Sequence, residues 1–408
     1  MSSLVSTVTN TLAVTPTTRV RGLEAFTSSH LWTPYGARGV FGGQVVAQSL
    51  MAAIDTVEGK DLHSQHCYFL LPANSKAPIT FTVERLRDGA SYATRLVHAL
   101  QDSRTVFILM ASFSAPPRKL PTDLVSPTGP AFFEPDSEQP AVDNSHDDKR
   151  DEPGITETLK FDKIAAKFAA KFDPPTNGTS TKPEVQRQPR RAFQPSYQKT
   201  MPTDIVPYKD AVTEEEIWES FLQRAKTKNV ALGSKVRAVQ NYIKERQQSP
   251  VTISIARAQS EEYPTTRAIW MRARLQPGET LTPNMVRALI AFATDFQFIG
   301  TGARTVGLSG TSKPRLGMMA SIDHCLHYYP LPADFDPSAP LLHVMDAVQV
   351  DVASGRGFVR GCVYTENGYL VASTSQEGVI RADISGKKPT MEHKRHQDAE
   401  NETDKAKL

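Results

Sequence analysis

The chain has 408 residues, enough for two or three domains, and it is 39% hydrophobic and 22% charged, so it can bury a sizeable core. Its formal net charge of +3 is near balance, which argues against a nucleic-acid-binding protein, because such proteins usually carry a basic patch or stripe. No apolar run approaches the length of a membrane span.

The N-terminal residues, 1–20, are expected to form a flexible arm. Met1–Leu23 contains no acidic residue, many Ser and Thr, and two arginines, which is a weak form of a transit-peptide composition. Because the arginines are so few and Pro16 interrupts the run, the arm is the preferred interpretation.

Residues 21–115 are expected to form a first folded region. The run GGQVVAQSLMAAI places Val46, Leu50 and Ile54 at helical spacing. After Gly89–Tyr92 come two strand-like runs, TRLVHAL and TVFILMASF. The region therefore combines one helix with an antiparallel sheet.

Residues 116–249 are expected to be an insert. Pro116–Gln198 is rich in Pro, Asp, Lys and Ser and buries too little apolar surface to offset its ordering entropy, so most of it should be disordered. Its run LKFDKIAAKFAAKF predicts a basic amphipathic helix, which we expect to pack on the protein itself rather than on a membrane. Thr213 and Glu216 predict a capping box, and Lys235–Gln247 a second helix.

Residues 250–385 are expected to form a second folded region. It opens with TPNMVRALIAFATDFQF, in which Thr282 is the predicted N-cap and Pro283 lies in the first turn. The run ASIDHCLHYYPLP, Ala320–Pro332, predicts one central strand. After Gly355–Phe358, the runs GFVRGCVYT and YLVASTSQEG predict two more.

The two folded regions repeat one another. His66–Pro72 reads HCYFLLP and His324–Pro330 reads HCLHYYP, with His, Cys and Pro at identical spacing. Each region is one helix followed by an antiparallel sheet, which predicts an α+β architecture with a pseudo-dimer interface.

The C-terminal tail, 386–408, is expected to be flexible and to carry a targeting signal. Ala406-Lys407-Leu408 is a near variant of Ser-Lys-Leu, the address read by the peroxisomal import receptor. The predicted location is the peroxisome matrix, with the mitochondrion and the cytosol as alternatives.

Six motifs together resemble the acyl-CoA thioesterase II family, over residues 20–115 and 250–385. They are FGGQVVAQSL, HSQHCYFLLP, ERLRDGASYATR, SIDHCLHYY, GRGFVRG and STSQEG. The resemblance implies a double hotdog: two helix-plus-antiparallel-sheet repeats, here with a long, partly disordered insert in place of a shorter linker. It also implies hydrolysis of acyl-CoA to fatty acid and CoA without a metal or cofactor, with Asp295, Ser321 and Gln376 as the catalytic trio.

The chemistry of thioester hydrolysis fits these three residues. The reaction needs an oriented, activated water. Asp295 follows an apolar helix face, where desolvation would raise its pKa, and Ser321 and Gln376 could hold the water at fixed geometry. A serine nucleophile is not expected, because Ser321 and His324 lie three apart along a strand and should face opposite sides.

The halves are expected to differ in activity. When His66 is aligned with His324, His63 corresponds to Ser321 and the segment Met110–Ser112 corresponds to Gln376. That segment contains no glutamine. We therefore expect one active site per chain, with the first half as scaffold and part of the acyl tunnel. Asp55, at the end of its helix, would then be inactive.

A metal site is not expected. His324 and His327 should face opposite sides of a strand, as should His63 and His66, and the three cysteines are odd in number and widely spaced. Such cysteine usage also argues against a disulfide framework and fits a reducing compartment. Cys325 and Cys362 are expected to be core thiols.

Three further features allow two interpretations each. Gly42-Gly43 could offer N–H groups to a CoA phosphate or an oxyanion, or could simply permit close helix–sheet packing. Asp323 could orient His324 or a backbone turn. Arg356 and Arg360 could meet CoA phosphates, or be ordinary exposed arginines.

Two other functions compete with hydrolysis. A hotdog enoyl-CoA hydratase would need an Asp and a His close together at the helix, whereas no histidine follows Asp295 before His324. A catalytically silent acyl-CoA-binding or regulatory protein would be free to lose the three polar residues, which are all present. A homodimer is expected if an apolar strand edge is exposed.

Overall fold

The computed structural model of the chain describes residues 7–35, 37–116, 196–228, 235–257 and 265–384. Both predicted folded regions belong to one compact unit, formed by Met1–Arg118 and Gln198–Leu408. The predicted amphipathic helix at 159–172 and the predicted targeting tail lie outside the described residues.

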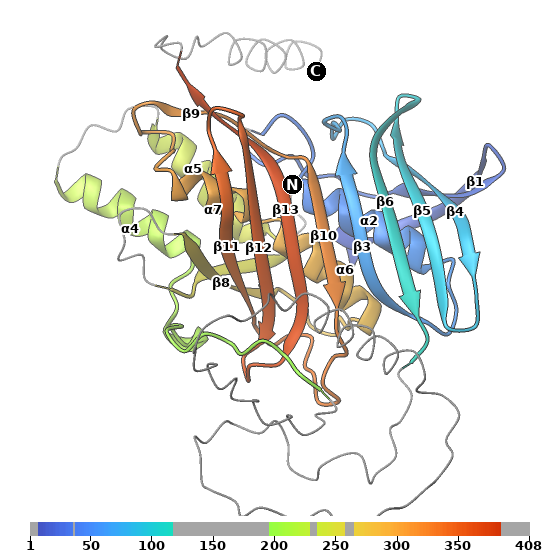
Figure 1. Cartoon of the computed structure of the whole chain (residues 1–408). Helices are drawn as coiled ribbons and strands as arrows, with labels where there is room; N and C mark the ends of the chain where they lie inside the picture. The colour runs from blue at the N-terminus through green and yellow to red at the C-terminus, as the bar shows by residue number, and fades with distance from the viewer. Residues whose placement is uncertain (1–6, 36, 117–195, 229–234, 258–264, 385–408) are drawn as a thin grey trace, which may run out of the picture. The chain divides into compact units, whose positions relative to one another are not determined.

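An antiparallel sheet of thirteen strands dominates the described residues (Figure 1). The strand order is β1-β2-β4-β5-β6-β3-β10-β13-β12-β11-β8-β7. The remaining strand, β9, pairs with the C-terminal part of β13, whereas β10 pairs with the preceding part of the same strand. The strands are β1 Val14–Val20, β2 Leu23–Ser28, β3 Asp61–Phe69, β4 Thr80–Asp88, β5 Tyr92–Gln101, β6 Arg104–Ser114, β7 Val251–Ile255, β8 Thr266–Ala273, β9 Arg315–Ser321, β10 Asp323–Tyr328, β11 Leu341–Asp351, β12 Arg356–Thr365 and β13 Leu370–Asp383.

The two halves meet at the middle of this sheet, where β3 pairs with β10. His66 lies opposite Cys325, and Cys67 lies opposite His324. The predicted repeat of one helix with an antiparallel sheet is confirmed, and the two repeats share one continuous sheet.

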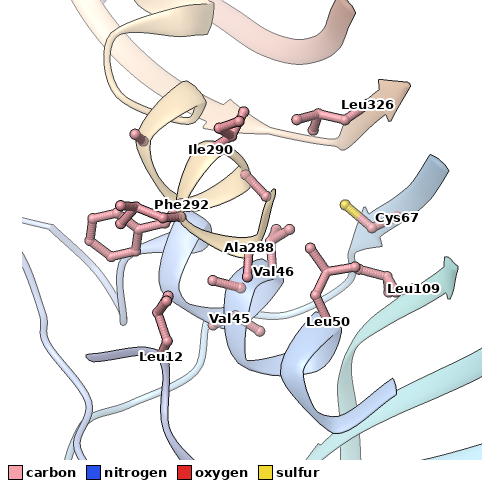
Figure 2. Packing of buried hydrophobic residues seen from close by; sticks show 14 of the residues in the cluster. Leu12, Val45, Val46, Leu50, Cys67, Leu109, Ala288, Ile290, Phe292 and Leu326 are labelled. Atoms are coloured by element: carbon pink, nitrogen blue, oxygen red, sulfur yellow. The ribbon is translucent and has the colours of Figure 1, made fainter. Parts of the chain in front are cut away.

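Two central helices pack against one face of the sheet and against each other. They are α2, Gly42–Ile54, and α6, Pro283–Thr294. Figure 2 shows Val46 and Leu50 of α2 close to Ala288 of α6, with strand residues beyond them. Val46, Leu50 and Ala288 are fully buried, and burying a Val or Leu side chain contributes about 1.5–3 kcal/mol.

The predicted N-cap of α6 is confirmed, but the helix ends earlier than the predicted run, which extends to Phe298. The side-chain oxygen of Thr282 accepts a hydrogen bond from the Met285 N–H at 3.2 Å. The helix ends at Thr294, because Gln297 adopts a left-handed backbone conformation with φ of 58°. A separate helix, α7 Phe298–Thr305, follows.

The predicted flexible arm is wrong over its described part. A short helix, α1 Val8–Leu12, and strand β1 occupy it. Val8 and Leu12 are fully buried against the core, and the Gln48 side-chain amide donates to the Thr11 carbonyl at 3.1 Å. The buried residues Val8 and Leu12 hold this short helix against the core. A helix of one turn is too short to be predicted from hydrophobic periodicity.

Both helices predicted late in the insert are present. They are α4, Glu214–Thr227, and α5, Lys235–Gln248, and a 3-10 turn at Tyr208–Asp210 precedes them. The capping box is confirmed: Thr213 accepts from the Glu216 N–H, and Glu216 accepts from the Thr213 N–H at 2.8 Å.

The single strand predicted for Ala320–Pro332 is wrong. The segment forms the end of β9 and the whole of β10, with Ile322 as an extra residue between them. Ser321 pairs with Gly378 while Cys325 pairs with Ser375, so five residues lie opposite four along this part of β13. This β-bulge changes the direction of Ser321 relative to the rest of the strand.

The edge strand β1 carries little that would promote pairing between chains. Its middle residues are exposed, and they include Pro16, which has no N–H, and Arg19. The homodimer therefore stays a prediction without support from this edge. In the part of the chain that the structure describes, no helix has the length and apolarity needed to span a bilayer.

Candidate active site

The Asp295 carboxylate lies where the C-terminal end of α6 meets the N-terminal end of α2. Its Oδ2 accepts a hydrogen bond from the Gly43 N–H at 2.8 Å. Its Oδ1 accepts from the Gln376 side-chain amide on β13 at 2.7 Å. The side chain is largely buried but keeps some access to solvent.

The two glycines at the start of α2 make this approach possible. A Cβ at Gly43 would lie 2.4 Å from the Phe292 carbonyl oxygen, and one at Gly42 would lie 2.9 Å from Asp295 Oδ2. The close packing that was one of the two interpretations made from the sequence is therefore confirmed. The Gly43 N–H is engaged by Asp295.

Ser321 also reaches Asp295. It ends β9, and its hydroxyl lies near enough to the Asp295 carboxylate to favour the charged form and lower the pKa of Asp295. Its cross-strand partner is Gly378, where a Cβ would lie 2.5 Å from Ile299 Cγ1. The structure thus brings the three residues predicted from the sequence to one point, although they come from α6, β9 and β13.

Burial raises the pKa of Asp295 above the ordinary aspartate value. The hydrogen bonds from Gln376 and Gly43 and the nearby Ser321 hydroxyl oppose this shift, because each favours the charged carboxylate. The net direction is upward, so Asp295 is a stronger base than an exposed aspartate.

Gln376 supplies a second polar atom to the same point. Its side chain is fully buried, and its Oε1 has no hydrogen-bond partner among the described residues. A buried amide oxygen without a partner can accept a hydrogen bond from a ligand hydroxyl or a water molecule. The site thus combines a carboxylate, a hydroxyl and a free carbonyl oxygen.

His324 lies closer to the site than the sequence predicted. Because the bulge at Ile322 adds a residue, Ser321 and His324 both face the helices, which corrects the expectation of opposite faces. The ring nitrogen Nε2 lies 3.4 Å from Thr294 Oγ1. Burial lowers the pKa of His324 to about 3, so the imidazole stays neutral.

The alignment of His66 with His324 is wrong by one residue. His66 lies opposite Cys325 and faces outward, whereas His324 faces the helices. A second bulge, at His63 between β3 and β6, matches the one at Ile322. Superimposing the bulges makes Leu62 the counterpart of Ser321 and Ala111 the counterpart of Gln376.

The other end of the helix pair therefore lacks the site's polar groups. Leu62 and Ala111 are buried and apolar. Counting back from the aspartate that ends each helix, the counterpart of Gly43 is Pro283, which has no N–H to donate. Of the site's groups, only Asp55 is present there, and burial raises its pKa also.

An aromatic cluster beside Asp295 escaped the sequence analysis. The Phe41 and Phe296 rings stack with centroids 4.4 Å apart, and Trp32 lies 5.2 Å from Phe41. The buried Arg246 guanidinium of α5 lies 4.4 Å from the Phe296 centroid, a cation–π contact. The contact could not be predicted from the sequence, because Arg246 and Phe296 are far apart along the chain.

Two other histidines that were considered for a metal site, His66 and His327, lie on the outer face of the sheet. His327 packs against His66 there, with ring centroids 5.5 Å apart. Cys325 is partly exposed, with its sulfur 3.2 Å from His66 Nδ1, so the expectation of a core thiol is wrong for this residue. Cys362 is only partly buried, but it packs against a buried hydrophobic cluster. No group of His, Cys, Asp and Glu within the described ranges could hold a metal ion.

The two arginines considered for CoA phosphates lie on the exposed side of β12. Arg356 forms an ion pair with Glu377 at 2.8 Å, and the Arg360 guanidinium lies over the Phe358 ring. Both arginines therefore already have a partner within the sheet.

Two helix-and-sheet repeats that share one antiparallel sheet define a double hotdog protein. Comparison with known proteins agrees. The family model for the acyl-CoA thioesterase N-terminal domain matches residues 29–114, and the model for the C-terminal domain matches residues 225–380. The second match begins within α4 and includes α5.

Two curated relatives and one solved structure illustrate the similarity. Acyl-coenzyme A thioesterase 8 of Mus musculus is 25% identical over 363 residues, which is 88% of this chain and 85% of that protein. Peroxisomal acyl-coenzyme A thioester hydrolase 1 of Saccharomyces cerevisiae is 35% identical over 82 residues, 20% of this chain and 24% of that protein. The acyl-CoA thioesterase II TesB2 of Mycobacterium marinum shares the fold, with a TM-score of 0.54, 19% identity, and coverage of 93% of this chain and 99% of that one. The chain belongs to the acyl-CoA thioesterase II family.

Replacing Gly43 with alanine should separate the two helices at the site. The new Cβ would meet the Phe292 carbonyl, so we expect the free energy of unfolding to fall by about 1–3 kcal/mol, as for overpacked cores. Gly300→Ala is the matched control, because the nearest atom to its Cβ is 4.0 Å away, and it should be neutral or stabilising by up to about 1 kcal/mol. Urea unfolding measures both, and equal behaviour of the two variants would contradict the close approach.

Proposed function

We propose that this acyl-CoA thioesterase hydrolyses fatty acyl-CoA by activating a water molecule with Asp295 as the general base. The observation that carries the proposal is the convergence of three groups. Gln376 Nε2 lies 2.7 Å from Asp295 Oδ1, and the Ser321 hydroxyl lies near the same carboxylate and lowers its pKa. The raised pKa of Asp295 supports the role of a base.

The proposed reaction uses each group for one task. Ser321 and the free Gln376 Oε1 orient the water, and Asp295 removes its proton as the oxygen attacks the thioester carbonyl carbon. The tetrahedral intermediate then breaks its carbon–sulfur bond. The CoA thiolate leaves and takes up a proton, and the fatty acid is released.

The competing functions receive less support. A hydratase would need a histidine that exchanges protons with substrate, but His324 is fully buried between Thr294 and Phe298 and its pKa is lowered to about 3. A catalytically silent binding protein would not need the Asp295 carboxylate, whose burial disfavours its charged form. An assay of thiol release separates hydrolysis from both alternatives.

Asp295→Asn should abolish most thiol release from acyl-CoA substrates of increasing chain length. The amide cannot accept the water proton, and loss of a positioned base typically costs about 10²–10⁴-fold in rate. The variant should fold as well as the wild type, because Gln376 can turn its own amide to accept from the new asparagine side chain and no buried charge remains.

Unfolding midpoints of the two proteins serve as the control for Asp295→Asn. A wild type that releases no thiol from any chain length would overturn the hydrolase function. A fully active variant would instead remove Asp295 from the mechanism.

The pH dependence of kcat/KM should report Asp295. Its raised pKa places the acidic limb above the value of about 3.9 for an ordinary aspartate, and activity should fall as pH drops through that limb. Ser321→Ala removes a hydroxyl that lowers this pKa, so the limb of the variant should move to higher pH. A limb that moves to lower pH would contradict this assignment.

We further propose that the enzyme acts in the peroxisome matrix. The support is the terminal Ala406-Lys407-Leu408 and the name of the yeast relative, a peroxisomal thioester hydrolase. The import receptor would bind this tripeptide.

Deleting these three residues should move the protein from the peroxisome to the cytosol. The measurement is microscopy of an N-terminal fluorescent fusion beside a peroxisomal marker. A deletion of Glu400–Glu402, which keeps the terminal tripeptide, should leave import intact. Co-localisation that survives loss of the tripeptide would overturn this address.

A further inference from the structure

The bulge at Ile322 leaves one backbone group of β13 without its usual partner. In a regular ladder, the Glu377 N–H would donate to the carbonyl of the residue opposite. Here the Ile322 N–H donates to the Glu377 carbonyl at 2.8 Å, but the Ile322 carbonyl accepts from the Phe69 N–H of β3 at 2.9 Å. The Glu377 N–H therefore needs another acceptor.

The Asp323 carboxylate is that acceptor. Its Oδ1 lies 2.6 Å from the Glu377 nitrogen, a distance typical of a charge-assisted hydrogen bond. Asp323 is partly buried and directly follows the bulged residue. Its side chain therefore replaces the missing carbonyl and joins β10 to β13 across the bulge.

This hydrogen bond lies between two of the groups that contact Asp295. Glu377 directly follows Gln376, and Asp323 lies two residues after Ser321. We propose that Asp323 is a positioning residue: it holds the bulge that aims Ser321 and Gln376 at Asp295, and takes no proton itself. The proposal rests on the proposed hydrolytic function of that site.

The first half of the chain offers an internal comparison. Its matching bulge at His63 places Ser64 at the position of Asp323, and the Ser64 hydroxyl lies 3.4 Å from His63 Nδ1 instead of bonding β6. The bulge at His63 thus has no carboxylate beside it. The residues that correspond there to Ser321 and Gln376 are Leu62 and Ala111, which have no polar side-chain group to position. The carboxylate thus occurs at the bulge beside the catalytic groups.

Three variants test the proposal with the full-length enzyme. Asp323→Ala removes the acceptor, whereas Asp323→Asn keeps an oxygen that can accept from the Glu377 N–H. Asp351→Ala is the matched control, because Asp351 Oδ1 accepts from the Ala353 N–H at 2.9 Å in an exposed turn that contributes nothing to the site. All three are assayed for thiol release from one acyl-CoA, and for amide exchange in the segment containing Glu377.

We expect kcat of Asp323→Ala to fall by about 10- to 100-fold with little change in KM, because a displacement near 1 Å costs that much in an oriented site. Exchange at Glu377 should accelerate in the same variant. Asp323→Asn should stay within about threefold of the wild type, as this rescue requires only an acceptor. Asp351→Ala should keep the wild-type kcat.

Two results with an active wild type would overturn the proposal and leave the hydrolytic function intact. One is an unchanged kcat in Asp323→Ala. The other is an Asn variant as impaired as the Ala variant, which would mean that the charge of Asp323, rather than its acceptor, matters. A wild type without thiol release would overturn the proposed function, and this proposal with it.

Discussion

The carboxylate of Asp295 stands at the end of a helix where a negative charge is disfavoured, and the start of another helix compensates for it. The C-terminal end of α6 carries partial negative charge from its free carbonyls. The Gly43 N–H, at the positive end of α2, lies 2.8 Å from the carboxylate and offsets that repulsion. This contact requires the end of one helix to touch the start of the other, which the shared sheet and the two glycines allow.

The two ends of the helix pair differ in chemistry although they share one geometry. At one end, the carboxylate meets an N–H, an amide and a hydroxyl. At the other, the matching positions are Pro283, Ala111 and Leu62, and Asn284 accepts instead from the Leu62 N–H at 3.3 Å. The second end is therefore closed by packing and one backbone cap, which suits a scaffold.

The sequence was sufficient to predict the two central helices, both helices late in the insert, four of the strands (β5, β6, β12 and β13), and three residues that the structure brings together. Helix periodicity and cap residues such as Thr282 are local signals, so they survive without knowledge of the fold. The two bulges were not predictable, because an extra residue in a strand leaves no mark on composition. Their effect was large, since a shift by one residue moves a side chain to the other face of a sheet. That is why His66 and His324 were paired although they face opposite ways, and why Asp323 received no definite role.

The proline at the start of α6 shows what a single chain gains over a symmetric pair of shorter ones. In a dimer of identical hotdog subunits, the two helices must begin with the same residues, because symmetry imposes each choice on both ends. Two requirements then compete for one position at the helix start. One is a residue whose N–H can reach a carboxylate, and the other is a residue that stabilises the first turn. Joining two repeats in one chain removes this conflict: α2 begins with flexible glycines that admit Asp295, and α6 begins with a rigid proline. One end of the helix pair is thus free to specialise in chemistry while the other specialises in order.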